Sequence, residues 1–221
     1  TARKKAKLGM ELSGLDIGIA SEGSFGVDPF TGMFSINVEC LLWLDKKNNI
    51  EITVVVESKT NLDHGTLGSW EECKSFAIKV GFPEHHLILR PHKEEMLSIY
   101  KGISSWDGLE EAFHKTLQIS GNNSLFVETD MRANSNPTRM ETIAQATQEL
   151  AKKITSTCPK CSAPGFWIVE HLSGLSCRVC SNPTQEIYAD LYGCSKCDYK
   201  QTHKRNETLY ANPMYCDFCN P

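Results

Sequence analysis

The stretch Cys158-Pro-Lys-Cys161 determines how the last third of this chain folds, because it is the first of four Cys-x-x-Cys pairs. The other three pairs are Cys177/Cys180, Cys194/Cys197 and Cys216/Cys219. Two cysteines on one tight turn direct their sulfurs to a common point, and two such turns form a tetrahedral cage. The spacers of 15 residues between the first two pairs and 18 residues between the last two fit structural zinc sites. The tail therefore predicts two bound Zn²⁺ ions.

The spacing alone leaves open which pairs share a metal. Sequential pairing, which joins the first pair to the second and the third pair to the fourth, is the arrangement that we predict. Pairing of the two outer and the two inner pairs is the alternative, because only 13 residues separate the second pair from the third. Cys161-Ser-Ala-Pro164 and Cys180-Ser-Asn-Pro183 match in spacing, as expected of two knuckles of one ribbon.

The cysteines also indicate a compartment. Eight paired cysteines could instead form four disulfides, but Cys-x-x-Cys spacing favours a metal and the preceding residues lack secretory features. A zinc protein of this kind is expected in a reducing compartment, most simply the cytoplasm. The two remaining cysteines, Cys40 and Cys73, lie in apolar segments and are interpreted as buried small hydrophobic residues rather than nucleophiles.

The charge of the chain restricts its partners. The formal net charge is -4, and two Zn(Cys)4 groups of about -2 each would bring it to roughly -8. A protein that binds duplex DNA without specificity needs a basic excess, and the only basic patch in the tail is residues 200–205. We therefore expect no strong nonspecific DNA binding, while a protein partner of the zinc ribbons is compatible with this charge. No apolar run reaches 18 residues, so no membrane-spanning helix is predicted.

Helical and strand patterns alternate over residues 1–156. We expect helices at 2–12, 69–80, 107–118 and 137–154, and strands at 15–20, 35–45, 51–58, 87–90 and 124–130. This order predicts an α/β domain, a three-layer sandwich with a mixed sheet that includes an antiparallel hairpin, followed by a double zinc ribbon at 157–221. The chain begins inside an expected helix, so we expect an upstream strand before Thr1.

A glycine- and serine-rich stretch, residues 21–26, is predicted as a loop directly after a strand. Gly23 lets the backbone approach a phosphate closely, and Ser21 and Ser24 add hydroxyl donors. Glu22 is a candidate Mg²⁺ ligand or base. The alternative is a tight turn with a solvated glutamate.

The second candidate stretch, residues 128–140, joins a buried strand to the last helix. Glu128 and Asp130 are two residues apart, so on an extended backbone they share a face and require a cation between them. Arg132, Asn136 and Arg139 supply positive charge and neutral donors at a helix start, where anions are favoured. These groups suit a phosphorylated substrate with Mg²⁺. The alternative is an internal ion-pair network that fastens the helix to the sheet.

The chain resembles a bacterial family of unknown function over nearly its whole length. The resemblance is carried by Gly18-Ile-Ala-Ser-Glu-Gly-Ser-Phe-Gly26, Glu128-Thr-Asp-Met-Arg-Ala133, Asn136-Pro-Thr-Arg-Met140, the four cysteine pairs and the ending Met214-Tyr-Cys-Asp-Phe-Cys-Asn-Pro221. It implies that a strand and a helix normally precede Thr1, and it implies no established activity.

A second resemblance is to house-cleaning nucleoside-triphosphate pyrophosphatases of the inosine-triphosphatase and Maf-like kind. It rests on Ala2-Arg-Lys-Lys-Ala6, on a strand that ends in Ile19-Ala-Ser-Glu-Gly23 and on the strand pair that follows. It implies that Glu22 binds Mg²⁺ and that Arg139 contacts a nucleotide. The phosphate-contacting first strand of those families has no counterpart in this sequence, and the zinc tail is foreign to them.

Two functional hypotheses follow. The first is a Mg²⁺-dependent phosphohydrolase acting on a nucleotide or another phosphorylated small molecule. Its catalytic residues would be Glu22, Glu128 and Asp130, and its substrate-binding residues Ser21, Gly23, Ser24, Arg132, Asn136 and Arg139. The second is a zinc-ribbon module that binds protein or nucleic acid on a non-catalytic α/β scaffold.

Overall fold

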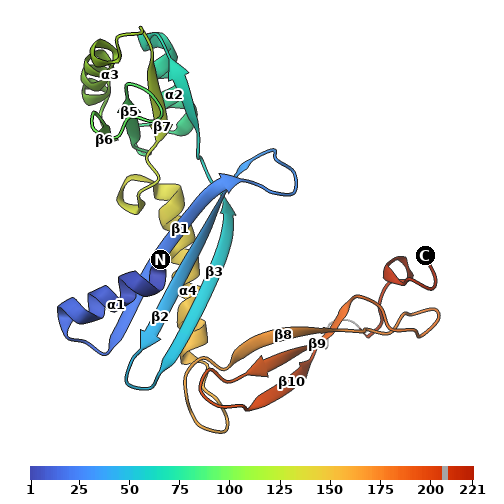
Figure 1. Ribbon diagram of the computed structural model, residues 1–221. Helices are drawn as coiled ribbons and strands as arrows, with labels where there is room; N and C mark the ends of the chain where they lie inside the picture. Colours follow the sequence, from blue (N-terminus) through green and yellow to red (C-terminus); the bar gives the residue numbers. More distant parts are fainter. Residues whose placement is uncertain (206–208) are drawn as a thin grey trace. The chain divides into compact units, whose positions relative to one another are not determined.

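The computed structural model describes residues 1–205 and 209–221 (Figure 1). The helices are α1 (Ala2–Ser13), α2 (Trp70–Val80), α3 (Trp106–Ser120) and α4 (Pro137–Thr155), with short 3₁₀ turns at Ala133–Ser135 and Pro213–Tyr215. The strands are β1 (Ile17–Val27), β2 (Ser35–Asp45), β3 (Ile50–Lys59), β4 (His64–Leu67), β5 (Leu87–Arg90), β6 (Tyr100–Ile103), β7 (Leu125–Thr129), β8 (Trp167–Ser173), β9 (Ile187–Gly193) and β10 (Lys200–Lys204). None of the helices formed by the described residues has the length and apolar composition to cross a bilayer.

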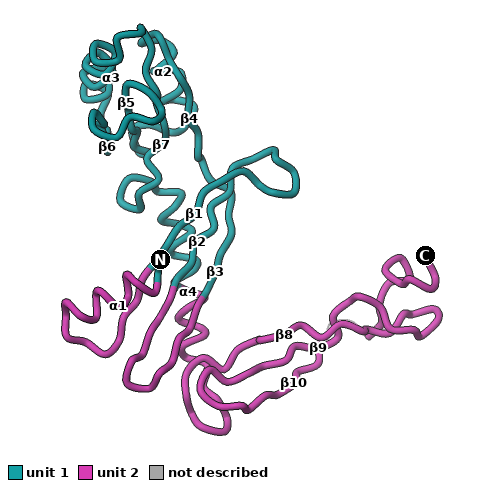
Figure 2. Tube along the Cα trace, viewed as in Figure 1, with its two compact units in different colours: residues 1–2, 21–41, 54–147 teal, residues 3–20, 42–53, 148–221 magenta. Residues whose placement is uncertain are grey.

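The chain divides into two compact units, and each contains several stretches of sequence (Figure 2). Unit 1 comprises residues 1–2, 21–41 and 54–147, and unit 2 comprises residues 3–20, 42–53 and 148–221. We predicted a boundary between residues 156 and 157, and that division into 1–156 and 157–221 stays a prediction.

The main core of unit 1 lies on one face of a four-stranded sheet of order β4-β7-β5-β6. Alternate residues of the paired strands β5 and β7 point to that face, including Leu87, Leu89, Leu125 and Val127. Helices α2 and α3 supply the other half of this core. Because strands are apolar on one face and helices on one stripe, the two layers bury both.

Local capping sets where the helices of unit 1 begin and end. The Ser69 side chain accepts from the Glu72 amide, and the Glu72 carboxylate accepts from the Ser69 amide, which together form a capping box. Gly81 ends α2 in the left-handed conformation, with φ 85°. Ser105 caps α3 in the same way as Ser69 caps α2.

A second sheet has the order β1-β2-β3, and its strands contribute residues to both units. Strand β3 alternates strictly, with Ile50, Ile52, Val54 and Val56 buried and the residues between them exposed. Residues 21–26 lie in the middle of β1, so the predicted loop is wrong. Glycine and serine are typical of loops, but pairing with β2 holds this stretch extended.

In unit 2, residues after α4 form a third sheet of order β10-β9-β8. The central strand β9 pairs antiparallel with both of its neighbours. Its last residue, Gly193, lies opposite Trp167 of β8 and opposite Lys200 of β10. The second cysteine pair lies between β8 and β9 and the third between β9 and β10, while the first pair precedes β8 and the fourth follows β10.

The α/β character and the C-terminal segment with two cysteine sites are confirmed. The strands are divided among three sheets, whereas we expected a sandwich around one mixed sheet. In the two sheets that lie wholly within one unit, every neighbouring pair is antiparallel. The helix-strand alternation predicts interleaving correctly, but it does not specify which strands pair.

Candidate metal centres and the buried polar cluster

Two groups of four cysteines form candidate metal centres in unit 2. The first tetrad is Cys158, Cys161, Cys194 and Cys197, and the second tetrad is Cys177, Cys180, Cys216 and Cys219. Within each tetrad all four sulfur atoms lie within 4.8 Å of one another. Both centres therefore have four soft donors converging on one point, the ligand set of a structural zinc site.

The sulfur-sulfur distances match a zinc ion. Four sulfurs at a Zn–S distance of about 2.3 Å from a central ion are about 3.8 Å from each other in a tetrahedron. In the first tetrad, the Sγ atoms of Cys158 and Cys197 are 3.9 Å apart and those of Cys161 and Cys194 are 3.6 Å apart. The corresponding distances in the second tetrad are 3.9 and 3.5 Å. Disulfide sulfurs would be separated by about 2.05 Å, so these cysteines are not bonded to one another.

The first two knuckles share one backbone conformation. Ser162 and Ser181 follow the second cysteine of their pairs, and both have positive φ, 58° and 63°. Each serine amide donates to the carbonyl of the first cysteine of its knuckle, at 2.8 and 3.0 Å. Proline follows two residues after each serine and forms an isolated bridge to the residue before the knuckle. The repeated Cys-Ser-x-Pro spacing thus encodes the same knuckle twice, but the prediction that both knuckles belong to one ribbon is wrong, because they lie in different tetrads.

The ligand order is crossed, and both pairings considered from the sequence are wrong. The first and third cysteine pairs form one tetrad, and the second and fourth pairs form the other. The sheet explains this order, because the start of β8 lies beside the end of β9. The first knuckle precedes β8 and the third follows β9, so they meet at one end of the sheet. Strand β10 returns to the other end, where the fourth knuckle meets the second.

The thiols of one tetrad influence each other's protonation. The backbone amide of Asn182 lowers the pKa of Cys180 to about 6. The neighbouring thiol of Cys180 in turn raises the pKa of Cys219 to about 12. Four like-charged thiolates this close require a cation to neutralise them, and zinc binding would displace the protons that remain.

The first tetrad is in contact with other segments of unit 2. In the first tetrad, Lys196 in the third knuckle places Nζ 3.4 Å from Asn48 Oδ1 in the β2–β3 turn. Hydrogen bonds from the side chain and backbone of Asn48 lower the pKa of Asp45, and the positive charge of Lys196 makes a smaller contribution in the same direction. Ser195 donates to the carbonyl of Pro164, and a Cβ on Gly165 would lie 2.8 Å from Ile52. The first tetrad is therefore packed within unit 2, and its metal would hold these segments together.

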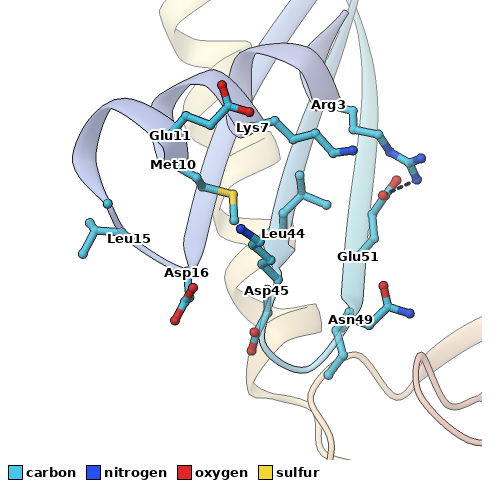
Figure 3. Close-up of a pocket in the computed structure, with 13 residues that line it drawn as sticks. Arg3, Lys7, Met10, Glu11, Leu15, Asp16, Leu44, Asp45, Asn49 and Glu51 are labelled. Atoms are coloured by element: carbon cyan, nitrogen blue, oxygen red, sulfur yellow. Dashed lines mark hydrogen bonds and ion pairs between the residues drawn. The ribbon is translucent and has the colours of Figure 1, made fainter.

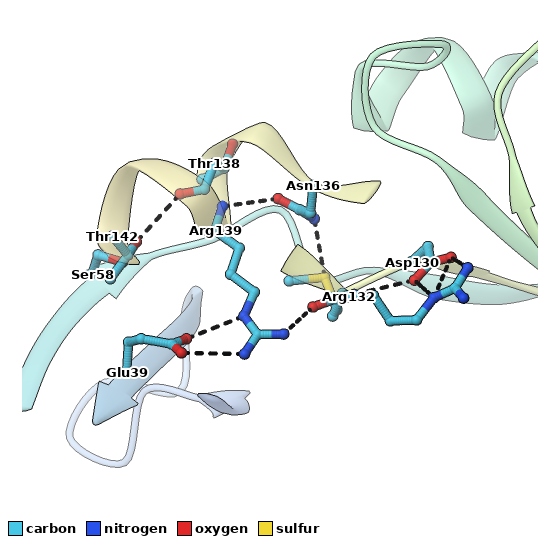
Figure 4. A network of polar contacts seen from close by, with 9 residues as sticks. Glu39, Ser58, Asp130, Arg132, Asn136, Thr138, Arg139 and Thr142 are labelled. Carbon is cyan, nitrogen blue, oxygen red and sulfur yellow. Dashed lines mark hydrogen bonds and ion pairs between the residues drawn. The ribbon is translucent and has the colours of Figure 1, made fainter. Parts of the chain in front are cut away.

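A buried ion pair dominates the polar cluster of unit 1 (Figure 4). Arg139 Nε and Nη2 lie 3.1 and 3.2 Å from the two carboxylate oxygens of Glu39, which is fully buried. Arg139 Nη1 donates to the Met131 carbonyl at 2.8 Å, and its guanidinium lies 5.2 Å from the centre of the Phe25 ring. The helix start is thus fixed to strands β1 and β2 through one arginine.

Gly23 brings the two predicted stretches together. A Cβ at this position would lie 2.6 Å from the Glu39 carboxylate and 2.7 Å from Arg139 Nη2, so a side chain there would displace the ion pair. Successive residues of a strand point to opposite faces, and Glu22 and Ser24 therefore point to the face opposite Gly23. Ser21 shares the face of Gly23. The structure places Arg139 against the backbone of β1, and it directs the Glu22 carboxylate elsewhere.

Asp130 and Glu128 each have an arginine of their own. Asp130 is fully buried, accepts from Arg132 Nε at 2.9 Å and from the Gly102 amide at 3.0 Å. Burial raises the pKa of Asp130. Hydrogen bonds from the Arg132 side chain and backbone, the charge of Arg132 and a hydrogen bond from the Gly102 amide lower it more, so the pKa of Asp130 is lowered overall. Glu128 pairs with Arg90 on β5, the strand next to its own. The two carboxylates do not share a cation.

Asn136 and Thr138 organise the first turn of α4. Asn136 Oδ1 accepts from the Arg139 amide at 3.0 Å, the bond of an N-cap, and its amide group donates to Asn61 Oδ1 at 3.0 Å. Thr138 Oγ1 lies 2.9 Å from His85 Nε2. Of the residues that we predicted to bind substrate, Arg132, Asn136 and Arg139 are thus engaged in contacts within the protein, as in the alternative of an internal network that fastens the helix to the sheet.

Two residues of this cluster were not predicted. Glu39 lies within the apolar stretch Val38-Glu-Cys-Leu-Leu42, and an acid in a strand of this kind signals a buried partner. Arg90 ends β5, and only the register of β5 against β7 brings it to Glu128. The first was detectable from the sequence, and the second was not.

The chain belongs to the family described as "Domain of unknown function (DUF6671)", whose model matches residues 5–221. This family confirms the first resemblance and provides no activity. No curated protein and no solved structure matches the chain.

Proposed function

We propose that residues 157–221 form a two-zinc module that docks a protein partner through its second tetrad. The observation that carries this proposal is a contrast between the two tetrads at equivalent positions. The residue before the second cysteine of each knuckle is Lys160 and Lys196 in the first tetrad, and Val179 and Phe218 in the second. Both Val179 and Phe218 are 70% exposed.

Other large apolar side chains gather in the segments around the second tetrad. They are Leu209, Tyr210, Met214 and Tyr215, and each is more than half exposed. Single exposed apolar residues need no explanation, but a concentration of six in the segments of one small site is typical of an interaction surface. Aromatic residues and methionine are also enriched at the centres of protein interfaces.

The charge at the second tetrad favours protein over nucleic acid. A Zn(Cys)4 group carries about -2, and Asp217 lies inside the same knuckle as Phe218. Both would repel phosphates. The basic patch at 200–205 is divided, because Lys200 and Lys204 lie on the face of β10 opposite to Arg205, which pairs with Asp190.

The test compares two double variants of the zinc-loaded chain. Val179→Ser with Phe218→Ser removes the apolar pair, and Lys160→Ser with Lys196→Ser is the matched control at the same knuckle positions. Burial of a valine and a phenylalanine contributes about 1.5–3 kcal/mol each, so the first variant should weaken partner binding by about 100-fold or more. The control should bind like the original chain.

Native mass spectrometry must first show two zinc ions in both variants. A protein captured by the original chain and the lysine control, but not by the apolar variant, supports the proposal. Equal capture by all three contradicts it. Capture of nucleic acid instead of protein, with an affinity for it that falls steeply between 50 and 500 mM salt, would also contradict the proposal.

A second candidate, a Mg²⁺-dependent phosphohydrolase, is favoured by one observation. Gly23 and Arg139 lie in contact although they are far apart in the sequence, as expected of two stretches that share a site. In this candidate Glu22, Glu128 and Asp130 hold Mg²⁺, and water attacks a phosphoanhydride to release pyrophosphate. The ion pairs of Glu128 and Asp130 would have to open when substrate binds, and the Glu22 carboxylate would have to turn from the opposite face of β1.

The assay for this candidate is pyrophosphate release from nucleoside triphosphates with Mg²⁺. Glu22→Gln should abolish turnover, and Glu57→Gln, an exposed acid on β3, should leave it unchanged. Absence of turnover on every nucleotide, or equal turnover in both variants, would reject the enzyme without affecting the docking proposal.

A further inference from the structure

A cavity of about 700 Å³ lies in unit 2, between α1, the turn at residues 14–16 and the β2–β3 hairpin (Figure 3). Its size falls within the range of small-molecule sites, about 300–1,000 Å³. It is separate in the chain from both tetrads and from the polar cluster.

Apolar side chains form part of the cavity lining. Met10 from α1, Leu44 from β2 and Ile50 from β3 line it, and all three are buried. Helix α1 can pack closely because Gly18 on β1 has no side chain, and a Cβ there would lie 2.7 Å from Met10. The apolar residues thus offer a floor for a hydrocarbon or aromatic group.

Two of the charged groups around this floor are already engaged. Glu51 pairs with Arg3 through Nη2, and Asp45 accepts from the backbone and side-chain amides of Asn48. Arginine has five N–H donors, so Arg3 retains donors for a second acceptor.

Lys7 lines the cavity from α1. Among the described residues it forms no ion pair, and the same holds for Lys46, which also lines the cavity. Lys7 follows Arg3 by one helical turn, so both project from one face of α1. Figure 3 shows the Lys7 ammonium directed toward the side of Arg3 and Glu51, over Leu44.

The remaining acids, Glu11 and Asp16, lie away from that end. In Figure 3 the Glu11 carboxylate points away from the Lys7 ammonium, and Asp16 lies at the opposite end of the cavity. Arg3, Lys7 and the Glu51 carboxylate paired with Arg3 therefore lie at one end of the cavity, which leaves one uncompensated positive charge there, and the apolar floor extends from that end.

We infer that this cavity binds a small organic anion with an apolar body. Its carboxylate or phosphate accepts from Lys7 and Arg3, and its apolar part covers Met10, Leu44 and Ile50. Charge-assisted hydrogen bonds fix the head group, and burial of the apolar part supplies further affinity. This inference does not depend on the docking surface or on the phosphohydrolase.

The test is calorimetric titration of the full chain with four probes. Phenyl phosphate and 4-phenylbutyrate carry an anionic head on an apolar body, inorganic phosphate has no apolar body, and phenethylamine reverses the charge. Both organic anions should bind more tightly than inorganic phosphate, and phenethylamine should not bind. A preference between the two anions identifies the head group.

Lys7→Gln should weaken binding of the organic anions by about tenfold, the loss of one charge-assisted bond. Lys4→Gln is the matched control, because Lys4 is exposed on the same helix and does not line the cavity. Thermal melts should show both variants folded. Equal weakening by both variants, an unchanged affinity in Lys7→Gln, or binding of phenethylamine as tight as that of the anions would overturn the inference.

Discussion

The crossed ligand order can be tested by counting metal ions in double variants. Cys161→Ser with Cys194→Ser removes two ligands from the first tetrad and leaves the second complete. Cys161→Ser with Cys180→Ser removes one ligand from each tetrad. The same number of cysteines is lost in both variants, so their difference reports which pairs share an ion.

The size of the expected effect follows from the closed geometry of each tetrad. Structural zinc sites of four sulfurs contribute about 10–16 kcal/mol of binding free energy at neutral pH. Serine is a poor ligand for zinc, and the sulfur-sulfur distances of 3.5–3.9 Å leave no nearby cysteine to replace a lost one. A tetrad that loses a ligand should therefore lose its ion to a moderate chelator, while an intact tetrad retains it.

Native mass spectrometry after dialysis against a chelating buffer measures the outcome. The Cys161/Cys194 variant should carry one zinc ion and the Cys161/Cys180 variant none. Sequential pairing would reverse these two counts. A third double variant, Cys161→Ser with Cys216→Ser, tests the outer-with-outer arrangement. It should lose both ions if the order is crossed and keep one ion if the two outer pairs share a metal. Reversed counts in the first two variants, or an ion kept in the third, would refute the geometry described above.

Three further outcomes are expected. Arg139→Met leaves the Glu39 charge buried without a partner and should cost about 3–5 kcal/mol in urea unfolding. Ser69→Ala removes an N-cap and should cost about 1 kcal/mol in the same assay. Hydrogen bonds from Arg205, together with His171, lower the pKa of Asp190 to about 2 from 3.8. The stabilisation by Asp190 should therefore be complete above about pH 4 and disappear as the pH falls through about 2, and NMR titration of Arg205→Gln should show the midpoint rising toward 3.8.

The sequence predicts features that depend on near neighbours along the chain. Cysteines two residues apart, the Cys-Ser-x-Pro repeat and the Ser69 capping box are local, and the structure contains all of them. The ligand order depends on how β8, β9 and β10 pair, which no local spacing encodes. For this reason the eight ligands could be identified from the sequence, but not the two groups to which they belong.

The polar stretches at residues 21–26 and 128–140 also have partners that the local sequence does not specify. Residues 21–26 were read as a loop from their composition, yet Gly23 is required there by the Arg139 and Glu39 side chains that lie against it. Glu128 and Asp130 were expected to share a cation because they are two residues apart. Arg90 comes to Glu128 through the β5–β7 register, and Arg132 folds back onto Asp130. Residue type predicted the charges that meet, but not their partners.

The crossed order has a consequence for how the tail holds together. In sequential ribbons each ion would close one contiguous stretch, and the two sites could form independently. Here each ion joins segments separated by two strands and by a ligand pair of the other site, so both closures depend on how β9 pairs with its neighbours. Metal at the first tetrad fixes the end where Trp167 lies opposite Gly193, and the strands carry that register to the second tetrad. We therefore expect metal at the first tetrad to support the strand register on which the knuckles of the second tetrad also depend.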